Sequence, residues 1–356
     1  MEKEVVIVIN SGSTSTKIAF YNRTGELVSE SISHPQSELS RYEKIADQLD
    51  YRYDLIKPFI DKNLSISEYK VIGVVGRGGI VKPIRGGTYL INEDFLADAR
   101  SGQYGEHASN LSSLLADRLK DKFKLPNSYT VDPVSTSNIS PIAEITGVPG
   151  FFRDGRAHTL NIKITARKIA QQQGIPFKES CYIVAHLGGG ISISLVVGGK
   201  IIDVNDGLLG MGPFSPNRSG ALPLRAVMKL CYSKPENEVI KLLSQNSGFK
   251  AYLGTEDLRE VLKMIKNGSK KAELIYNAFI YQISKNIGAY YAASKCMAKG
   301  IVITGGIAHN VKVIDDLKEY LGTLAEFHIY PGENEMEALA EGIFRVIDRE
   351  EEALEY

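Results

Sequence analysis

Two short turns rich in glycine and serine, each lying between apolar strands, could bind a phosphate group. The first follows an apolar strand at 5–9, where the chain reads VVIVINSGSTSTKIAF. After Asn10, the small residues Gly12, Ser13 and Ser15 leave backbone N–H groups and hydroxyls open to an oxyanion, with Lys17 beside them. The Walker A pattern lacks its second glycine here, and a strand follows in place of a helix, which argues against a P-loop NTPase. Considered by itself, this turn could equally be the Ser/Thr-rich tip of a hairpin that binds no ligand.

The second turn repeats this plan in the other half of the chain. From Cys181 the sequence CYIVAHLGGGISIS gives an apolar strand, one polar residue, a glycine turn and another strand. His186 is therefore the counterpart of Asn10. Two later apolar segments, 71–79 and 300–306, each end in a double glycine, and such strand ends bind ligands in open α/β sheets.

These repeats predict two similar lobes in tandem that together hold one phosphate chain. The expected lobes are residues 1–174, on the substrate and phosphate side, and residues 175–356, on the nucleotide side. The first lobe could also receive the C-terminal helix.

Charged residues at turns and strand ends are the remaining candidates for chemistry. Arg77 lies in a glycine turn, although arginine is also common in turns that bind nothing. Asp132 ends a strand at 128–132, where a loop cap is the simpler alternative. Arg218 lies in a long glycine-rich loop, 206–223, that is costly to order unless it binds a ligand.

The composition excludes several function classes. The 356 residues carry 42 basic and 42 acidic side chains, and no basic cluster is interleaved with aromatics, so a nucleic-acid partner is not expected. Cysteines Cys181, Cys231 and Cys296 show no CxxC spacing and are typical of reduced thiols in the cytoplasm. The chain enters a strand at once, so no signal peptide is expected. The most apolar stretch, 181–199, is interrupted by polar residues and glycines and predicts no membrane span.

The hydrophobic pattern predicts helices at 40–61, from 92, through 111–119, at 159–173 and at 270–299. The last of these carries a stripe of apolar and aromatic residues that is typical of a core or of a subunit interface. A homo-oligomer is expected, with this stripe as one candidate interface.

Five segments in order, VINSGSTSTK, AHLGGGISIS, FSPNRSG, ITGGIAHN and YPGENEMEALAEG, together resemble the butyrate kinases, in the acetate kinase branch of the actin/hexokinase/Hsp70 ATPase superfamily. The resemblance implies an α/β fold of two duplicated actin-like (ribonuclease H-like) lobes, each a mixed sheet flanked by helices, with the active site in the cleft. It also implies a reversible, Mg²⁺-dependent phosphoryl transfer between ATP and the carboxylate of butyrate or a similar short-chain acid, giving ADP and an acyl phosphate.

The same resemblance implies roles for individual residues. Those expected at the reacting groups are Arg77, Arg218, His158, His186 and Asp132. Those expected to bind phosphate are Asn10, Ser13, Ser15, Lys17, His107, Gly188, Gly189 and Gly190. Those expected to bind the nucleotide are Asp257, Arg259, Gly305, Gly306, Ile307 and Asn310. Magnesium would be held by Asp132 and Glu335, with Glu337 as the alternative to Glu335 because the local alignment slips.

Two positions depart from the family pattern. Acetate kinases carry an acidic residue where this chain has His309, which favours an acid other than acetate. Butyrate kinases follow the Asp-Pro-Val motif with an acidic stretch, whereas Asp132-Pro-Val is followed here by Ser135 and other neutral residues.

The implied chemistry fits these residue types. A carboxylate nucleophile is already ionised at neutral pH and needs no general base. The difficulty is electrostatic, because an anion must approach a triphosphate in line, and this requires arginines, histidines, Mg²⁺ and N–H groups. Two alternatives stay open: a sugar kinase of the same superfamily, and a non-enzymatic nucleotide-binding module such as an Hsp70-like ATPase.

Overall fold

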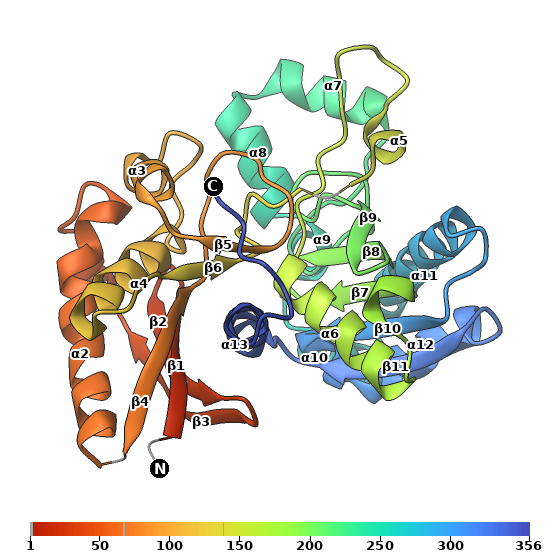
Figure 1. Ribbon diagram of the computed structural model, residues 1–356. Coiled ribbons are helices and arrows are strands. Elements are labelled where there is room, and N and C mark those ends of the chain that lie inside the picture. The colour runs from red at the N-terminus through yellow and green to blue at the C-terminus, as the bar shows by residue number, and fades with distance from the viewer. Residues whose placement is uncertain (1–2, 67, 138) are drawn as a thin grey trace. The chain divides into compact units, whose positions relative to one another are not determined.

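The structure, a computed structural model, describes residues 3–66, 68–137 and 139–356 and divides into two compact units (Figure 1). Unit 1 comprises Met1–Ser137 and Asn334–Tyr356, and unit 2 comprises Asn138–Glu333. The division differs from the expected boundary at residue 174. The reason is that helix α6 (Thr159–Gln172) packs its apolar face on the sheet of unit 2.

Unit 1 is built on a mixed six-stranded sheet with the order β3-β2-β1-β4-β6-β5. The strands are β1 (Lys3–Ser11), β2 (Ser15–Asn22), β3 (Gly25–Ser33), β4 (Tyr69–Gly76), β5 (Thr88–Leu90) and β6 (Tyr129–Val131). The helices are α1 (Gln36–Leu39), η1 (Ile45–Gln48), α2 (Leu49–Ile66), α3 (Glu93–Ser101), α4 (Asn110–Phe123) and α13 (Glu335–Ile347). β1 is antiparallel to β2 and parallel to β4. It is apolar throughout its centre because its alternate residues pack against α2 and α4 on one face and α13 on the other.

Unit 2 repeats this arrangement in a five-stranded sheet with the order β11-β10-β7-β8-β9. Its strands are β7 (Cys181–Leu187), β8 (Ile191–Val197), β9 (Lys200–Val204), β10 (Gly300–Gly305) and β11 (Glu326–Pro331). As in unit 1, the first strand forms a hairpin with the second and runs parallel to the strand of the double glycine, β10. The duplication predicted from the two turns is therefore confirmed.

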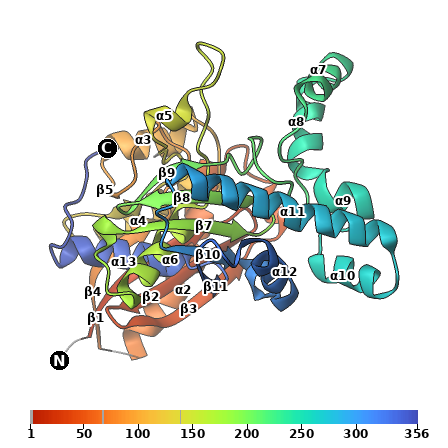
Figure 2. The ribbon, with the colours of Figure 1, turned by 90° about the vertical axis from the view of Figure 1, so that its right-hand side faces the viewer.

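The helices of unit 2 cover both faces of this sheet (Figure 2). Besides α6, unit 2 contains α5 (Pro141–Glu144), η2 (Phe177–Glu179), α7 (Leu224–Ser233), α8 (Glu236–Gln245), α9 (Gly248–Leu253), α10 (Leu258–Lys266), α11 (Lys270–Ala293), η3 (Gly306–His309) and α12 (Val311–Leu321), of which α7 and α8 project away from the sheet. The aromatic stripe of α11 is core: Phe279, Ile283 and Ile287 are fully buried against β7 and β8. Leu274, near the start of the stripe, is exposed, so these residues confirm the core role of the stripe and leave the subunit interface a prediction.

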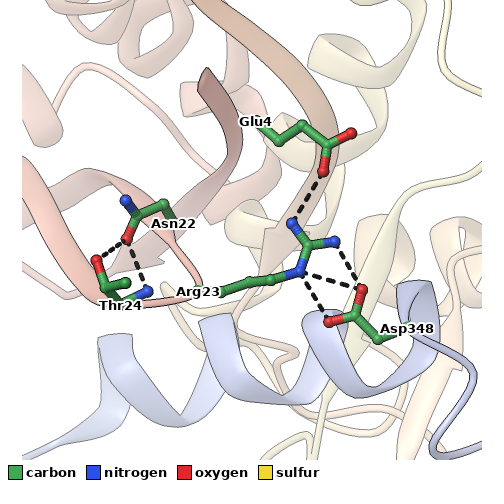
Figure 3. A network of polar contacts seen from close by, with 5 residues as sticks. All are labelled: Glu4, Asn22, Arg23, Thr24 and Asp348. Atoms are coloured by element: carbon green, nitrogen blue, oxygen red, sulfur yellow. Dashed lines mark hydrogen bonds and ion pairs between the residues drawn. The ribbon is translucent and has the colours of Figure 1, made fainter. Parts of the chain in front are cut away.

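The C-terminal helix α13 lies in unit 1, where ion pairs and close packing hold it. Arg23, in the turn after β2, donates to Asp348 at the end of α13 (Nε to Oδ2, 2.9 Å) and to Glu4 on β1 (Nη1 to Oε2, 2.9 Å) (Figure 3). Gly342 lets α13 approach β6, since a Cβ there would lie 2.5 Å from Val131 Cγ2.

Two predicted helices have different bounds. The segment predicted as one helix at 40–61 is a 3₁₀ turn, η1, followed by α2, and the helix predicted to reach residue 299 ends at Ala293. Within the described residues, no helix is both long and apolar enough to cross a bilayer.

Candidate active site

The first candidate turn joins β1 to β2, as predicted. Asn10 pairs with Lys17 across the hairpin, and the turn is closed by a hydrogen bond from the N–H of Gly12 to the carbonyl of Ser15 (2.7 Å). The side chains of Ser13 and Lys17 are exposed. The backbone therefore presents an open hairpin tip with a lysine beside it.

Asn10, Arg77 and Glu335 come together at the carboxyl ends of β1 and β4, which meet because these strands are parallel. Glu335, the first residue of α13, accepts from Asn10 Nδ2 (2.8 Å) on one carboxylate oxygen and pairs with Arg77 Nη2 (3.1 Å) through the other. The backbone N–H of Arg77 donates to the carbonyl of Ile9 (2.9 Å), which fixes where the arginine leaves the sheet. The sequence analysis predicted each residue but not this contact between them.

His107 lies near this cluster, within reach of the charges of Arg77 and Glu335. Its Nδ1 accepts from the backbone N–H of Ser109 (3.2 Å), so the ring hydrogen is on Nε2. Burial lowers the pKa of His107, and the positive charge of Arg77 lowers it further, against the opposing charge of Glu335.

Asp132 is buried at the end of β6 in the left-handed region, with a φ of 40°. Its Oδ1 accepts from the N–H of Gly87 (2.9 Å), a loop-anchoring contact of the kind that the sequence left as an alternative. Among the described residues, no three His, Cys, Asp or Glu side chains form a group that could hold a metal alone. A magnesium ion at this site would need phosphate oxygens among its ligands, as Mg²⁺ commonly has.

In unit 2, the turn between β7 and β8 is covered by three predicted side chains. A Cβ at Gly190 would lie 2.3 Å from Arg218 Nη1 and 3.3 Å from His158 Cε1, and one at Gly188 would lie 3.3 Å from His186 Nε2. The absence of side chains at Gly188 and Gly190 therefore leaves room for Arg218 and the two histidines to lie close against the turn.

His158 and His186 stack with ring centroids 3.8 Å apart and planes 9° apart. Asn161 Nδ2 donates to His186 Nδ1 (2.8 Å) and to Thr304 Oγ1 (3.0 Å), which places the ring hydrogen of His186 on Nε2, beside the glycine turn. Burial lowers the pKa of His186 to about 4, so the ring is neutral. His186 thus offers a hydrogen-bond donor and no positive charge. Asn161 was missed, because nothing in the sequence distinguishes it from other polar residues of a helix.

Arg218 is held over the turn by its own loop. Ser215 Oγ donates to the carbonyl of Gly189 (2.5 Å) and accepts from the N–H of Arg218 (3.2 Å). Arg218 Nη1 donates to the carbonyl of Gly207, and Nε is buried with no hydrogen-bond partner among the described residues. Burial lowers the pKa of Arg218, with Asp206 opposing. Because Nε is enclosed by protein atoms, an anion could contact this guanidinium only through Nη1 and Nη2.

A cavity of about 730 Å³ opens beside the same turn. It is lined by the predicted residues Gly188, Gly189, Asp257, Arg259, Gly306, Ile307 and Asn310, and by Pro216, Asn217, Glu256, Leu258 and His309. Its volume suits a ligand of nucleotide size. Asp257 also caps α10, accepting from the N–H of Arg259 (2.8 Å). Gly305 does not line the cavity; its φ is +86° and a Cβ would lie 2.4 Å from the carbonyl oxygen of Leu187.

The neutral state of His186 predicts how stability depends on pH. The unfolded ring titrates near pH 6.5 and the folded ring at about 4, so the unfolded state binds the extra proton in between. The contribution of His186 to the free energy of unfolding is fully present above pH 6.5. It falls by about 3 kcal/mol as the pH drops towards 4. His186→Asn, which keeps an acceptor for Asn161, should lose less free energy of unfolding between pH 7 and 4.5 than the wild type in urea titrations. Equal losses would contradict the burial of an uncharged ring.

Comparison with known proteins identifies relatives over the full chain. Residues 150–351 match the model of the acetokinase family. The chain is 41% identical over 354 residues, 99% of both sequences, to a probable butyrate kinase of Clostridium botulinum and likewise to butyrate kinase 2 of Clostridium acetobutylicum. The acetate kinase of Entamoeba histolytica superposes with a TM-score of 0.75 at 18% identity, over 95% of this chain and 98% of that one, which shows a shared actin-like α/β fold.

Proposed function

The chain belongs to the acetokinase family, and from this premise we propose that it is a short-chain fatty acid kinase. In this reaction, phosphoryl transfer between ATP and a carboxylate such as butyrate gives ADP and an acyl phosphate, reversibly. The observation that carries the proposal is the buried guanidinium of Arg218, which lies over the glycine turn at a cavity of nucleotide size.

The groups of unit 2 suit the nucleotide. Adenosine would occupy the cavity near Gly306 and Asn310. Its phosphates would extend to the turn 188–190, where the Nε2–H of His186 and the guanidinium of Arg218 can donate to phosphate oxygens. Phosphoryl transfer depends mainly on such positioning and charge stabilisation.

The groups of unit 1 suit the acid and its phosphate. Arg77 would hold the carboxylate, while Asn10, Ser13, Ser15, Lys17 and His107 would bind the oxygens of the acyl phosphate. A carboxylate oxygen attacks the γ-phosphorus as the bond to the ADP oxygen breaks, so no proton moves. Because the reaction needs no general base, His107 is not required to accept a proton. It can instead donate a hydrogen bond through its Nε2–H.

As ligands of magnesium we propose the carboxylates of Glu335 and Asp132. When bound with the nucleotide it would neutralise phosphate charge, and these side chains would hold it together with phosphate oxygens. Glu335 is better placed for this role than Glu337, because it contacts Asn10 and Arg77. Glu337 lies near Tyr21 in β2, where burial and then Glu26 raise the pKa of the phenol and the charge of Glu337 adds to their effect.

Butyrate is the proposed acid because the relatives that are 41% identical are named butyrate kinases. His309 does not support this choice. It lines the cavity of unit 2 with Gly306 and Asn310, so the departure at this position bears on the nucleotide and not on the length of the acid.

Trapping of acyl phosphates as hydroxamates tests the proposal. With ATP and Mg²⁺, a panel of acetate, propionate, butyrate, isobutyrate and valerate should give product, with the highest kcat/KM for butyrate or its nearest neighbours. Glucose and glycerol are included as phosphoryl acceptors, because a sugar kinase would phosphorylate them in place of the acids. Phosphorylation of a sugar and of no carboxylate would contradict the proposal, and so would ATP binding without transfer to any acceptor.

A further inference from the structure

Arg52 is the largest side chain in unit 1 that is almost wholly buried, with 1% of its surface exposed. It projects from α2 to the inner side of the hairpin turn between β1 and β2. Nη1 donates to the carbonyl of Gly12 (2.9 Å) and of Ser15 (3.2 Å), and Nη2 lies 3.4 Å from the carbonyl of Ser13. Gln48 Oε1 accepts from Nε (3.1 Å) and Nη2 (2.9 Å).

The surroundings of this cation contain no compensating charge. Every hydrogen-bond partner of Arg52 among the described residues is neutral, and none of the ion pairs found there includes it. His34, which shares Thr16 Oγ1 with Arg52, is kept uncharged because burial, and then Arg52, lower its pKa to about 4. Burial lowers the pKa of Arg52 only to about 10, so its charge remains at neutral pH.

The contacts of Arg52 determine where the turn directs its N–H groups. In a trans peptide the C=O and N–H point in opposite directions. The carbonyls of Gly12 and Ser13 point inward to the guanidinium, and they share their peptide units with the N–H groups of Ser13 and Thr14. Among the described residues these two N–H groups have no acceptor. Hydrogen bonding at each carbonyl also polarises its peptide unit, which strengthens the N–H as a donor.

We propose that Arg52 is a positioning residue that orients and polarises the Ser13 and Thr14 N–H groups, and that its uncompensated charge attracts the phosphate bound at this turn. The inference rests on the proposed function only in taking the turn as a phosphate site. Arg52 acts through the turn, behind its carbonyls, and needs no contact with the substrate.

Gln48→Glu tests the role of the charge while keeping the geometry. Glutamate can accept both hydrogen bonds from Arg52 and adds the missing negative charge. The probe is inorganic phosphate, titrated against the NMR signals of the Ser13 and Thr14 amides. We expect the phosphate Kd to rise about tenfold with no loss of thermal stability. Gln171→Glu, exposed on α6 in unit 2, is the matched control and should keep the wild-type Kd. An unchanged Kd in Gln48→Glu would overturn the proposal.

Arg52→Lys and Arg52→Met separate charge from packing. Lysine keeps the charge without the planar fork, so its phosphate Kd should lie between those of the wild type and the methionine variant. Equal affinities in the two variants would mean that charge has no role and would overturn the proposal. If Arg52→Met fails to fold, the lysine and Gln48→Glu variants still decide the question. The phosphate titration uses neither ATP nor a carboxylate. Its result can therefore be interpreted even if the hydroxamate assay finds no acid that is phosphorylated.

Discussion

Arg218→Ala should lower kcat by about 10³-fold or more. This is the loss of kcat expected on removing an arginine that stabilises the transition state of phosphoryl transfer. The guanidinium lies against Gly190, at the turn proposed to receive the nucleotide phosphates, so its charge can stabilise a group that gains charge in the transition state. The KM for ATP should change far less, because the cavity is lined by residues other than Arg218. Steady-state kinetics in both directions measure the two effects.

The control for this experiment is Arg225→Ala, which removes an exposed arginine from the start of α7 and should leave kcat unchanged. Arg218→Lys should recover only a small part of the loss, because a lysine cannot reproduce the planar fork that holds the contact with Gly207. Turnover near that of the wild type in Arg218→Ala would remove this arginine from the mechanism.

Glu335→Gln should raise the Mg²⁺ concentration needed for half-maximal activity by about ten- to a hundredfold. Glutamine fills the same volume and can still accept from Asn10, but it removes the charge that holds Arg77 and would hold the metal. Activity measured against Mg²⁺ at saturating ATP gives the result.

Glu337→Gln provides the matched comparison, since it makes the same change two residues further along α13, near Tyr21. It should retain the Mg²⁺ requirement of the wild type. If the two variants exchanged these behaviours, Glu337 would be the magnesium ligand and the assignment of Glu335 would be wrong.

The elements that carry the candidate site were predictable because they are local patterns. The apolar strands before Asn10 and His186, and the glycine turns after them, each occupy a few consecutive residues, and their repetition revealed the duplicated fold. Position at a strand end was likewise enough to select Arg77 and Asp132.

The residues that support the site were not predictable, because their roles depend on contacts distant in sequence. Arg52 reaches a turn about forty positions earlier in the chain, and Asn161 orients a ring on a different strand. In the sequence, each is one polar residue in an amphipathic helix. The neutrality of His186 was missed for the same reason, since burial on all sides follows only from the packed sheet.

The path of the chain through the two units constrains the order in which they can fold. Unit 2 is a continuous segment inserted into unit 1, and the helix α13, which follows unit 2 in the sequence, covers one face of the unit 1 sheet. During synthesis, unit 2 therefore leaves the ribosome before α13 does. Until then, the face of β1 and β4 that packs on α13 stays uncovered, and exposed strand surface of this kind is prone to aggregation. Closure of unit 1 by α13 can thus occur only after unit 2 has been synthesised, and it is also the step that brings Glu335 to Asn10 and Arg77.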